Sequence, residues 1–229
     1  MISPNIVWIF SLSAFAVIAL TIFIIIFVSS RKMDPKFSFL RSFPYEFMNE
    51  RGNQVILFKP LLYVLTGFAF SPLFVITPLI KDFGSLGFFS VMICCIFGLA
   101  MISNCLLFFF DARYTKTHMI LFTVSSCLAF LSNTLTTIYS FVIFKGYKDM
   151  AINHTGSLIL GIISGVIAIA VLFLIVNPKL KNWAKLEADG DGEEKTYKRG
   201  KVFILAFTEW LILLLSIVGE IIFFLTLIK

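Results

Sequence analysis

The sequence has little charge for its length. Aspartate, glutamate, lysine and arginine make up 14% of the 229 residues, whereas soluble domains carry roughly 25%. Hydrophobic residues make up 59% of the chain. This composition is typical of a membrane protein and argues against a soluble globular domain. The net charge of +6 therefore bears on orientation in the membrane, and we expect no binding to nucleic acid.

Residues that bind metals or act as nucleophiles are also scarce. The chain has two histidines and four cysteines, and it contains no Walker loop, HExxH, GxSxG or CxxC motif. The topology predicted below places His118 and His154 at opposite membrane faces, so we expect no metal site and no cofactor. All four cysteines fall in predicted spans, where they act as small buried residues rather than as a disulfide framework.

Six apolar runs are long enough to cross a bilayer, which takes ~20 residues of helix. The first run is longer than the apolar core of a signal peptide, about 7 to 15 residues, so we expect it to be retained as a span. We predict an all-α fold, a six-helix transmembrane bundle that forms a single domain over residues 1–229. The six predicted spans are 6–28, 56–80, 86–110, 118–144, 156–177 and 202–228.

Lysine and arginine are divided unevenly between the two sides of this topology. Fourteen of the 19 lie in the first, third and fifth loops, four lie on the opposite side, and Lys59 lies within the second span. Because basic loops stay in the cytoplasm, we predict that loops 29–55 and 178–201 are cytoplasmic and that both termini are non-cytoplasmic. We expect an integral protein of the cell or plasma membrane.

The last predicted span contains two carboxylates, Glu209 and Glu220. A charge at the bilayer centre costs roughly 2.5 to 3.5 kcal/mol, so such residues tend to face protein or water and mark functional sites. Their spacing turns a helix by about three turns plus 20°, and Ser216 falls on the same face. We predict that this face binds a proton, a cation or a cationic ligand, with Lys59 the one basic residue placed to meet Glu209. Alternatively, both glutamates are protonated and bonded to backbone carbonyls, and Lys59 extends to the membrane surface.

The fourth predicted span carries a second polar stripe. Asn133 and Thr137 fall within an arc of about 60° that also holds Ser126 and Ser140. If this stripe meets the carboxylate face of the last span, the two line a hydrogen-bonding path, to which Asn133 and Thr137 contribute ligand groups. The alternative is that these groups join helices through hydrogen bonds of about 0.6 kcal/mol each.

Two further features predict contacts with another membrane protein. In the first loop, Phe39, Phe43 and Phe47 recur at helical spacing, which predicts a short cytoplasmic helix in the membrane interface that docks a partner or connects two spans. In the fifth span, Gly161 and Gly165 form a small-xxx-small pattern, which lets a neighbouring backbone approach closely. That neighbour is either another helix of this chain or a second protein.

The loop 178–201 has an acidic run between two basic clusters. The run begins like a calcium-binding loop, but Glu194 stands at the sixth position instead of glycine and Gly200 at the twelfth instead of glutamate. We therefore predict a flexible, solvated linker whose lysines favour the anionic cytoplasmic leaflet.

The Thr208-Glu209-Trp210 stretch resembles the glutamate–tryptophan pair in the final helix of six-span membrane proteins of the Frag1 and DRAM type. The resemblance covers three residues. It implies a long non-cytoplasmic first loop, whereas the basic first loop of this chain predicts the cytoplasmic side. The sequence is therefore assigned to no family.

Three functions are compatible with these features. We favour a small transporter, or the membrane subunit of a transporter, that binds a proton, a cation or a cationic or polar ligand at Glu209 and Glu220. The alternative is a non-catalytic accessory or scaffolding subunit, which binds another membrane protein within the lipid bilayer. Enzyme chemistry on a lipid has the least support, because the sequence places no His, Cys or metal beside the two carboxylates.

Overall fold

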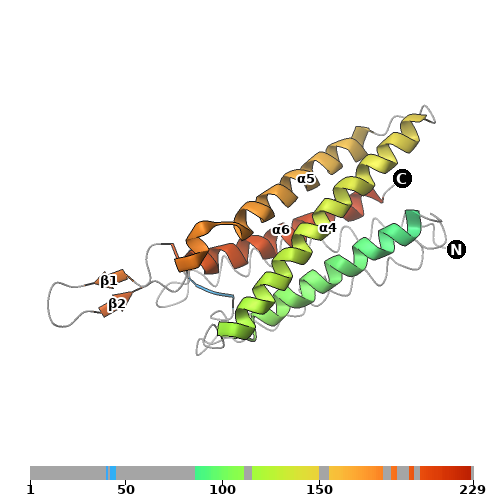
Figure 1. Cartoon of the computed structure of the whole chain (residues 1–229). Helices are drawn as coiled ribbons and strands as arrows, with labels where there is room; N and C mark the ends of the chain where they lie inside the picture. The colour runs from blue at the N-terminus through green and yellow to red at the C-terminus, as the bar shows by residue number, and fades with distance from the viewer. Residues whose placement is uncertain are drawn as a thin grey trace, which may run out of the picture.

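The computed structural model describes four long helices and a small hairpin (Figure 1). The helices are Leu86–Leu107, α4 (Thr115–Asp149), α5 (Thr155–Ile175) and α6 (Ile204–Thr226). The residues that the structure describes are 40, 42–44, 86–110, 115–149, 155–182, 187–189, 196–198 and 202–227.

All four described helices are long and apolar enough to cross a membrane. Even the shortest apolar stretch among them has 22 residues, which exceeds the ~20 that a bilayer requires. These helices indicate a membrane protein, and they match the predicted spans 86–110, 118–144, 156–177 and 202–228. The predicted spans 6–28 and 56–80 lie outside the described residues.

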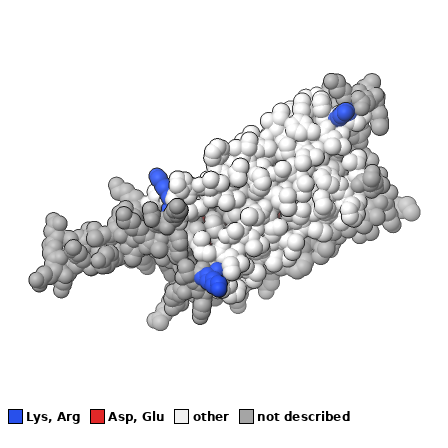
Figure 2. All heavy atoms as spheres, in the orientation of Figure 1, with Lys and Arg blue, Asp and Glu red and all other residues white. Residues whose placement is uncertain are grey.

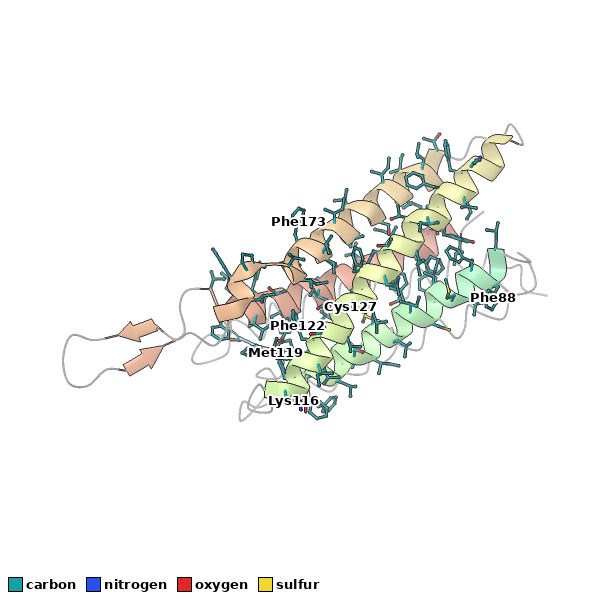
Figure 3. All side chains as sticks on the ribbon, in the orientation of Figure 1. Phe88, Lys116, Met119, Phe122, Cys127 and Phe173 are labelled. Atoms are coloured by element: carbon teal, nitrogen blue, oxygen red, sulfur yellow. The ribbon has the colours of Figure 1, made fainter. Side chains whose placement is uncertain are left out.

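The outer surface of the described helices is apolar along their length. Figure 2 shows residues other than Lys, Arg, Asp and Glu over the long middle of the visible face, with Lys and Arg near its two ends. Phe173 on the outer side of α5 and Phe88 near one end of its helix are each 75% exposed (Figure 3). An apolar belt between basic ends is the surface that a bilayer requires.

Helix α6 is the most enclosed element of the described bundle. It packs against both α4 and α5, which also pack against each other, and 15 of its 23 residues are buried. The buried face of α4 advances by alternating steps of four and three residues, as in helices that cross at a small angle. The residues at these steps are His118, Phe122, Ser125, Ala129, Ser132, Thr136, Tyr139 and Ile143, and Ser126, Asn133 and Ser140 are buried beside them.

The predicted cytoplasmic loop 178–201 contains regular structure. A 3-10 turn, η1 (Pro178–Asn182), follows α5, and β1 (Glu187–Asp189) pairs antiparallel with β2 (Thr196–Lys198). Figure 1 shows this hairpin extending past the helix ends. The prediction of a flexible linker throughout this loop is therefore wrong for these residues, because their backbone groups pair with each other. In the described chain these are the only strands.

A short segment of the first loop, Leu40 with Ser42 to Pro44, lies against the start of α6. The backbone N–H of Phe203 donates to the carbonyl oxygen of Leu40 at 2.6 Å, and Nε1 of Trp210 donates to that of Ser42 at 2.8 Å. The described residues of this segment form turns or irregular backbone. The predicted interfacial helix is not confirmed in them, since these carbonyls accept from α6.

Candidate functional site

Helices α4 and α6 bring a histidine and a glutamate together inside the bundle. His118 lies in the first turn of α4 and Glu209 in the second turn of α6. Nε2 of His118 is 2.7 Å from Oε1 of Glu209, and both side chains are buried. Lys116, at the start of α4 in Figure 3, is exposed two residues before His118. The pair therefore lies near a basic end of the bundle.

The bonds of His118 determine how many protons the pair holds. Nδ1 is 2.7 Å from the carbonyl oxygen of Phe110, which can only accept, so Nδ1 carries a proton. A second proton must lie between Nε2 and Oε1, since two bare acceptors would repel each other at hydrogen-bond distance. The pair is then either a neutral imidazole with a carboxylic acid or an imidazolium with a carboxylate. It has no net charge in either form.

Aromatic rings lie against and near this pair. Phe43, from the first-loop segment, is buried and packs edge-on against His118, with ring centroids 5.6 Å apart. Phe43 also packs against Phe203 at 5.4 Å. Trp210, the neighbour of Glu209 in sequence, packs edge-on against Phe108 at 5.8 Å. Phe43 thus places an apolar ring directly against His118, and the other rings pack nearby.

The pair can release the proton that it shares or take it up again. Without that proton the two side chains together would carry one negative charge, and a buried charge is costly in a medium of low dielectric constant unless a positive group lies beside it. A cation that replaced the proton would keep the pair neutral. The arrangement can therefore bind a proton, or exchange it for a positive charge.

The predicted carboxylate face of α6 is enclosed along its whole length. Glu209, Ser216 and Glu220 are all buried. Ser216 donates to the carbonyl oxygen of Ile212 at 2.7 Å. The two glutamates are eleven residues apart, about 16 Å along the axis, and each lies within two turns of one end of α6.

The polar stripe of α4 meets α6 beside Glu220. The carboxamide of Asn133 lies so close to Gly219 that a Cβ there would come within 2.7 Å of its Nδ2. Nδ2 donates to the carbonyl oxygen of Ala129 at 2.8 Å, and Ser164 of α5 donates to the carbonyl oxygen of Asn133 at 2.9 Å. Asn133 thus joins all three helices at this level.

Most hydroxyl groups of the stripe bond within their own helix. Thr137 donates to the carbonyl oxygen of Asn133 at 2.9 Å, and Ser126 and Ser140 donate to the carbonyl oxygens of Phe122 and Thr136 at 2.6 and 2.8 Å. These protons are therefore used locally, and what the hydroxyls offer a neighbouring helix is small size and oxygen lone pairs. This favours the helix-joining interpretation for Thr137.

The two glycines predicted to dock a neighbour face α4 of the same chain. A Cβ on Gly161 would lie 3.0 Å from Cβ of Ser140, and one on Gly165 would lie 3.5 Å from Cγ2 of Thr137. Phe43 is buried beside His118, while Phe39 and Phe47 lie outside the described residues. Docking of a second protein at these residues remains a prediction.

His118 is a partner of Glu209 that the sequence did not predict. The expectation that no histidine lies beside the carboxylates is wrong, and Lys59 lies outside the described residues. A signal was present in the sequence. The fourth and sixth spans start at the same predicted face, so the first turn of one and the second turn of the other lie at a similar depth.

Within the described ranges, no cluster of three or more His, Cys, Asp or Glu residues could hold a metal ion. The fold and the site define a membrane protein whose helical bundle encloses a histidine–glutamate pair that shares a proton. Comparisons with protein-family models, curated proteins and solved structures found no match.

Proposed function

We propose that this protein is a small membrane transporter, or the membrane subunit of a transporter, that binds a proton, a cation or a cationic ligand at His118, Glu209 and Glu220. The buried His118–Glu209 pair is the observation that carries the proposal. An ionisable pair in a membrane helix is costly and typically marks a proton or ion pathway. The charge of the pair changes by one unit when it gains or loses a proton, which is the property that proton-coupled transport uses.

The bonds of His118 favour transport over enzyme chemistry. A histidine that activates a hydroxyl or thiol nucleophile keeps a ring nitrogen directed at it. Here Nδ1 is bonded to Phe110 and Nε2 to Glu209. Both nitrogens are engaged, which supports proton binding by the pair itself.

On this proposal the chain crosses the cell membrane six times as one domain, with both termini non-cytoplasmic. The first-loop segment around Phe43 and the basic loop 178–201 then face the cytoplasm. Exposed Lys116 and Lys179 border the end of the bundle where the pair lies, which supports placing His118 and Glu209 toward the cytoplasmic side.

Proton flux into vesicles tests the proposal. Purified protein is reconstituted with a pH-sensitive dye inside, and a potential is imposed. The wild-type protein should acidify the lumen, and Glu209→Gln combined with Glu220→Gln should lower the rate at least about 100-fold. Glutamine keeps the shape and hydrogen-bonding capacity of glutamate but cannot ionise.

Thr123→Val is the matched control, because Thr123 lies on the exposed face of α4 and bonds only to its own helix at the carbonyl oxygen of Met119. Flux that is unchanged in the double glutamine variant would overturn the proposal. A wild-type protein that moves neither protons nor cations, yet copurifies with a second membrane protein, would support the accessory-subunit alternative instead.

A further inference from the structure

A second buried polar pair lies between the Leu86–Leu107 helix and α4. Oγ of Ser125 donates to Oδ1 of Asn104 at 2.6 Å, and Asn104 is 2% exposed. The other end of this amide, Nδ2, has no hydrogen-bond partner within the described part of the chain. A buried donor without an acceptor is costly, and more so where no bulk water can reach it. The amide therefore needs an acceptor that the described chain does not supply.

Ring contacts place Asn104 about halfway along the carboxylate face of α6. Phe108 packs against Trp210 at 5.8 Å and Phe97 against Phe223 at 6.0 Å, so the Leu86–Leu107 helix runs antiparallel to α6. Interpolation between these contacts puts Asn104 about level with Ser216. That level lies between Glu209 and Glu220.

Asn104 also lies on the side of its helix that faces α6. Phe97, Met101, Asn104 and Phe108 recur at steps of four, three and four residues and are all buried, so they share one face. The first and last of them touch α6. Ser125, the partner of Asn104, lies on the same buried face of α4 as His118. That face also contacts α6, because His118 bonds to Glu209. The Asn104–Ser125 pair therefore lies where three helices meet.

The chemistry of this position selects its ligand. The Nδ2 end presents N–H donors, which repel a metal cation and attract an acceptor. An anion would bring a net charge into the membrane, whereas a water molecule is a neutral acceptor that can donate onward. On α6, the hydroxyl of Ser216 donates a hydrogen bond to the carbonyl oxygen of Ile212. Its oxygen can still accept a hydrogen bond from such a water.

We infer that Asn104 binds a water molecule, and that this water is the middle of a proton route along α6 between the His118–Glu209 pair and Glu220. The inference rests on the proposed function and narrows its ligand to the proton. The anchored water divides a separation of about 16 Å into two parts of about 8 Å, each longer than one hydrogen bond of about 3 Å, so further water molecules complete the route on either side. In each transfer a water accepts a proton from one hydrogen-bonded neighbour and releases a different one to the next, so its composition is unchanged.

The site is tested first without transport. In water-edited solid-state NMR of the full chain in lipid bilayers, the side-chain amide signal of Asn104 should receive magnetisation from water. Asn104→Leu, which keeps the side-chain size and removes the donors, identifies this signal by its loss. An Asn104 amide signal that receives nothing from water would overturn the inference.

The route is tested by proton flux in the vesicle assay. Asn104→Leu should lower flux about 100-fold while Thr123→Val leaves it unchanged. Asn104→Leu that conducts like the wild type would overturn the route, even if the Glu209→Gln and Glu220→Gln variant is inactive and the proposed function stands. Unchanged flux in that glutamine variant would remove the proposed function, and the route with it, while a water signal at Asn104 would still support the binding site.

Discussion

His118 is fixed at both ring nitrogens, by the carbonyl oxygen of Phe110 and by Glu209. These bonds fix the ring orientation and keep a proton on Nδ1, while the shared proton lies between Nε2 and Oε1. The edge-on contact with Phe43 adds packing on the ring itself. A buried polar pair of this kind is stable only while both partners are present.

Removing one member of the pair should therefore destabilise the protein more than removing both. His118→Leu leaves the Glu209 carboxyl buried beside an apolar side chain and should cost about 3 to 5 kcal/mol. Combining it with Glu209→Met, of similar volume, should recover most of that loss. The measurement is thermal unfolding in detergent, followed by tryptophan fluorescence.

Thr123→Val again serves as the control, and it should leave the unfolding temperature within error of the wild type. If the losses from His118→Leu and Glu209→Met simply add in the double variant, the two side chains are not energetically coupled. The pair would then have no special role in stability.

At the scale of elements, the approach of α4 to α6 depends on one glycine. Asn133 is buried and bonded to Ala129 and Ser164, so its carboxamide cannot easily move away from Gly219. A Cβ there would require this carboxamide to shift. The same contact holds the helix backbone beside Glu220 in place.

Gly219→Ala should therefore destabilise the bundle. Overpacking against the Asn133 carboxamide is expected to cost about 1 to 3 kcal/mol and to lower the unfolding temperature measured by the same fluorescence assay. Gly146→Ala is a matched control on α4, because nothing lies within 4 Å of a Cβ there. That control should be neutral or slightly stabilising, since alanine favours a helix over glycine by about 1 kcal/mol. Equal changes in the two variants would show that close approach to the Asn133 carboxamide does not decide the effect.

At the scale of the whole molecule, the described bundle combines an apolar belt with an enclosed polar interior. Glu209 and Glu220 lie near opposite ends of α6, and Asn104 with Ser216 lies between them. Polar groups are thus spread over the depth of the membrane on the faces that the helices turn toward each other. On the proposed function, this distribution places proton-binding groups at several depths of the membrane.

The proposed orientation makes its own prediction. An epitope fused at either terminus should bind antibody on intact cells, and one inserted between β1 and β2 should bind only after permeabilisation. The reason is the excess of lysine and arginine in the loops predicted to be cytoplasmic. As a control, both epitopes should bind antibody in permeabilised cells. Detection of the hairpin epitope on intact cells would show that the orientation is the opposite one.

Much of the described fold follows from the sequence. The four described helices match four predicted spans. Helix α6 carries Glu209, Ser216 and Glu220 on one buried side, as the helical period predicts. Asn104 carried the same kind of signal as Asn133, a carboxamide in an apolar span, yet it stood alone in its span and was missed. For Gly161 the sequence left two neighbours open, and the structure places α4 beside it.

The sequence by itself determined the membrane class, the limits of the described helices to within a few residues, and the polar face of α6. These properties depend on local hydrophobicity and on the period of one helix. Only the tertiary structure decided which group each polar side chain meets. His118 and Glu209 are 91 residues apart in the chain, and their contact depends on which helices pack together and at what rotation, which no local pattern specifies.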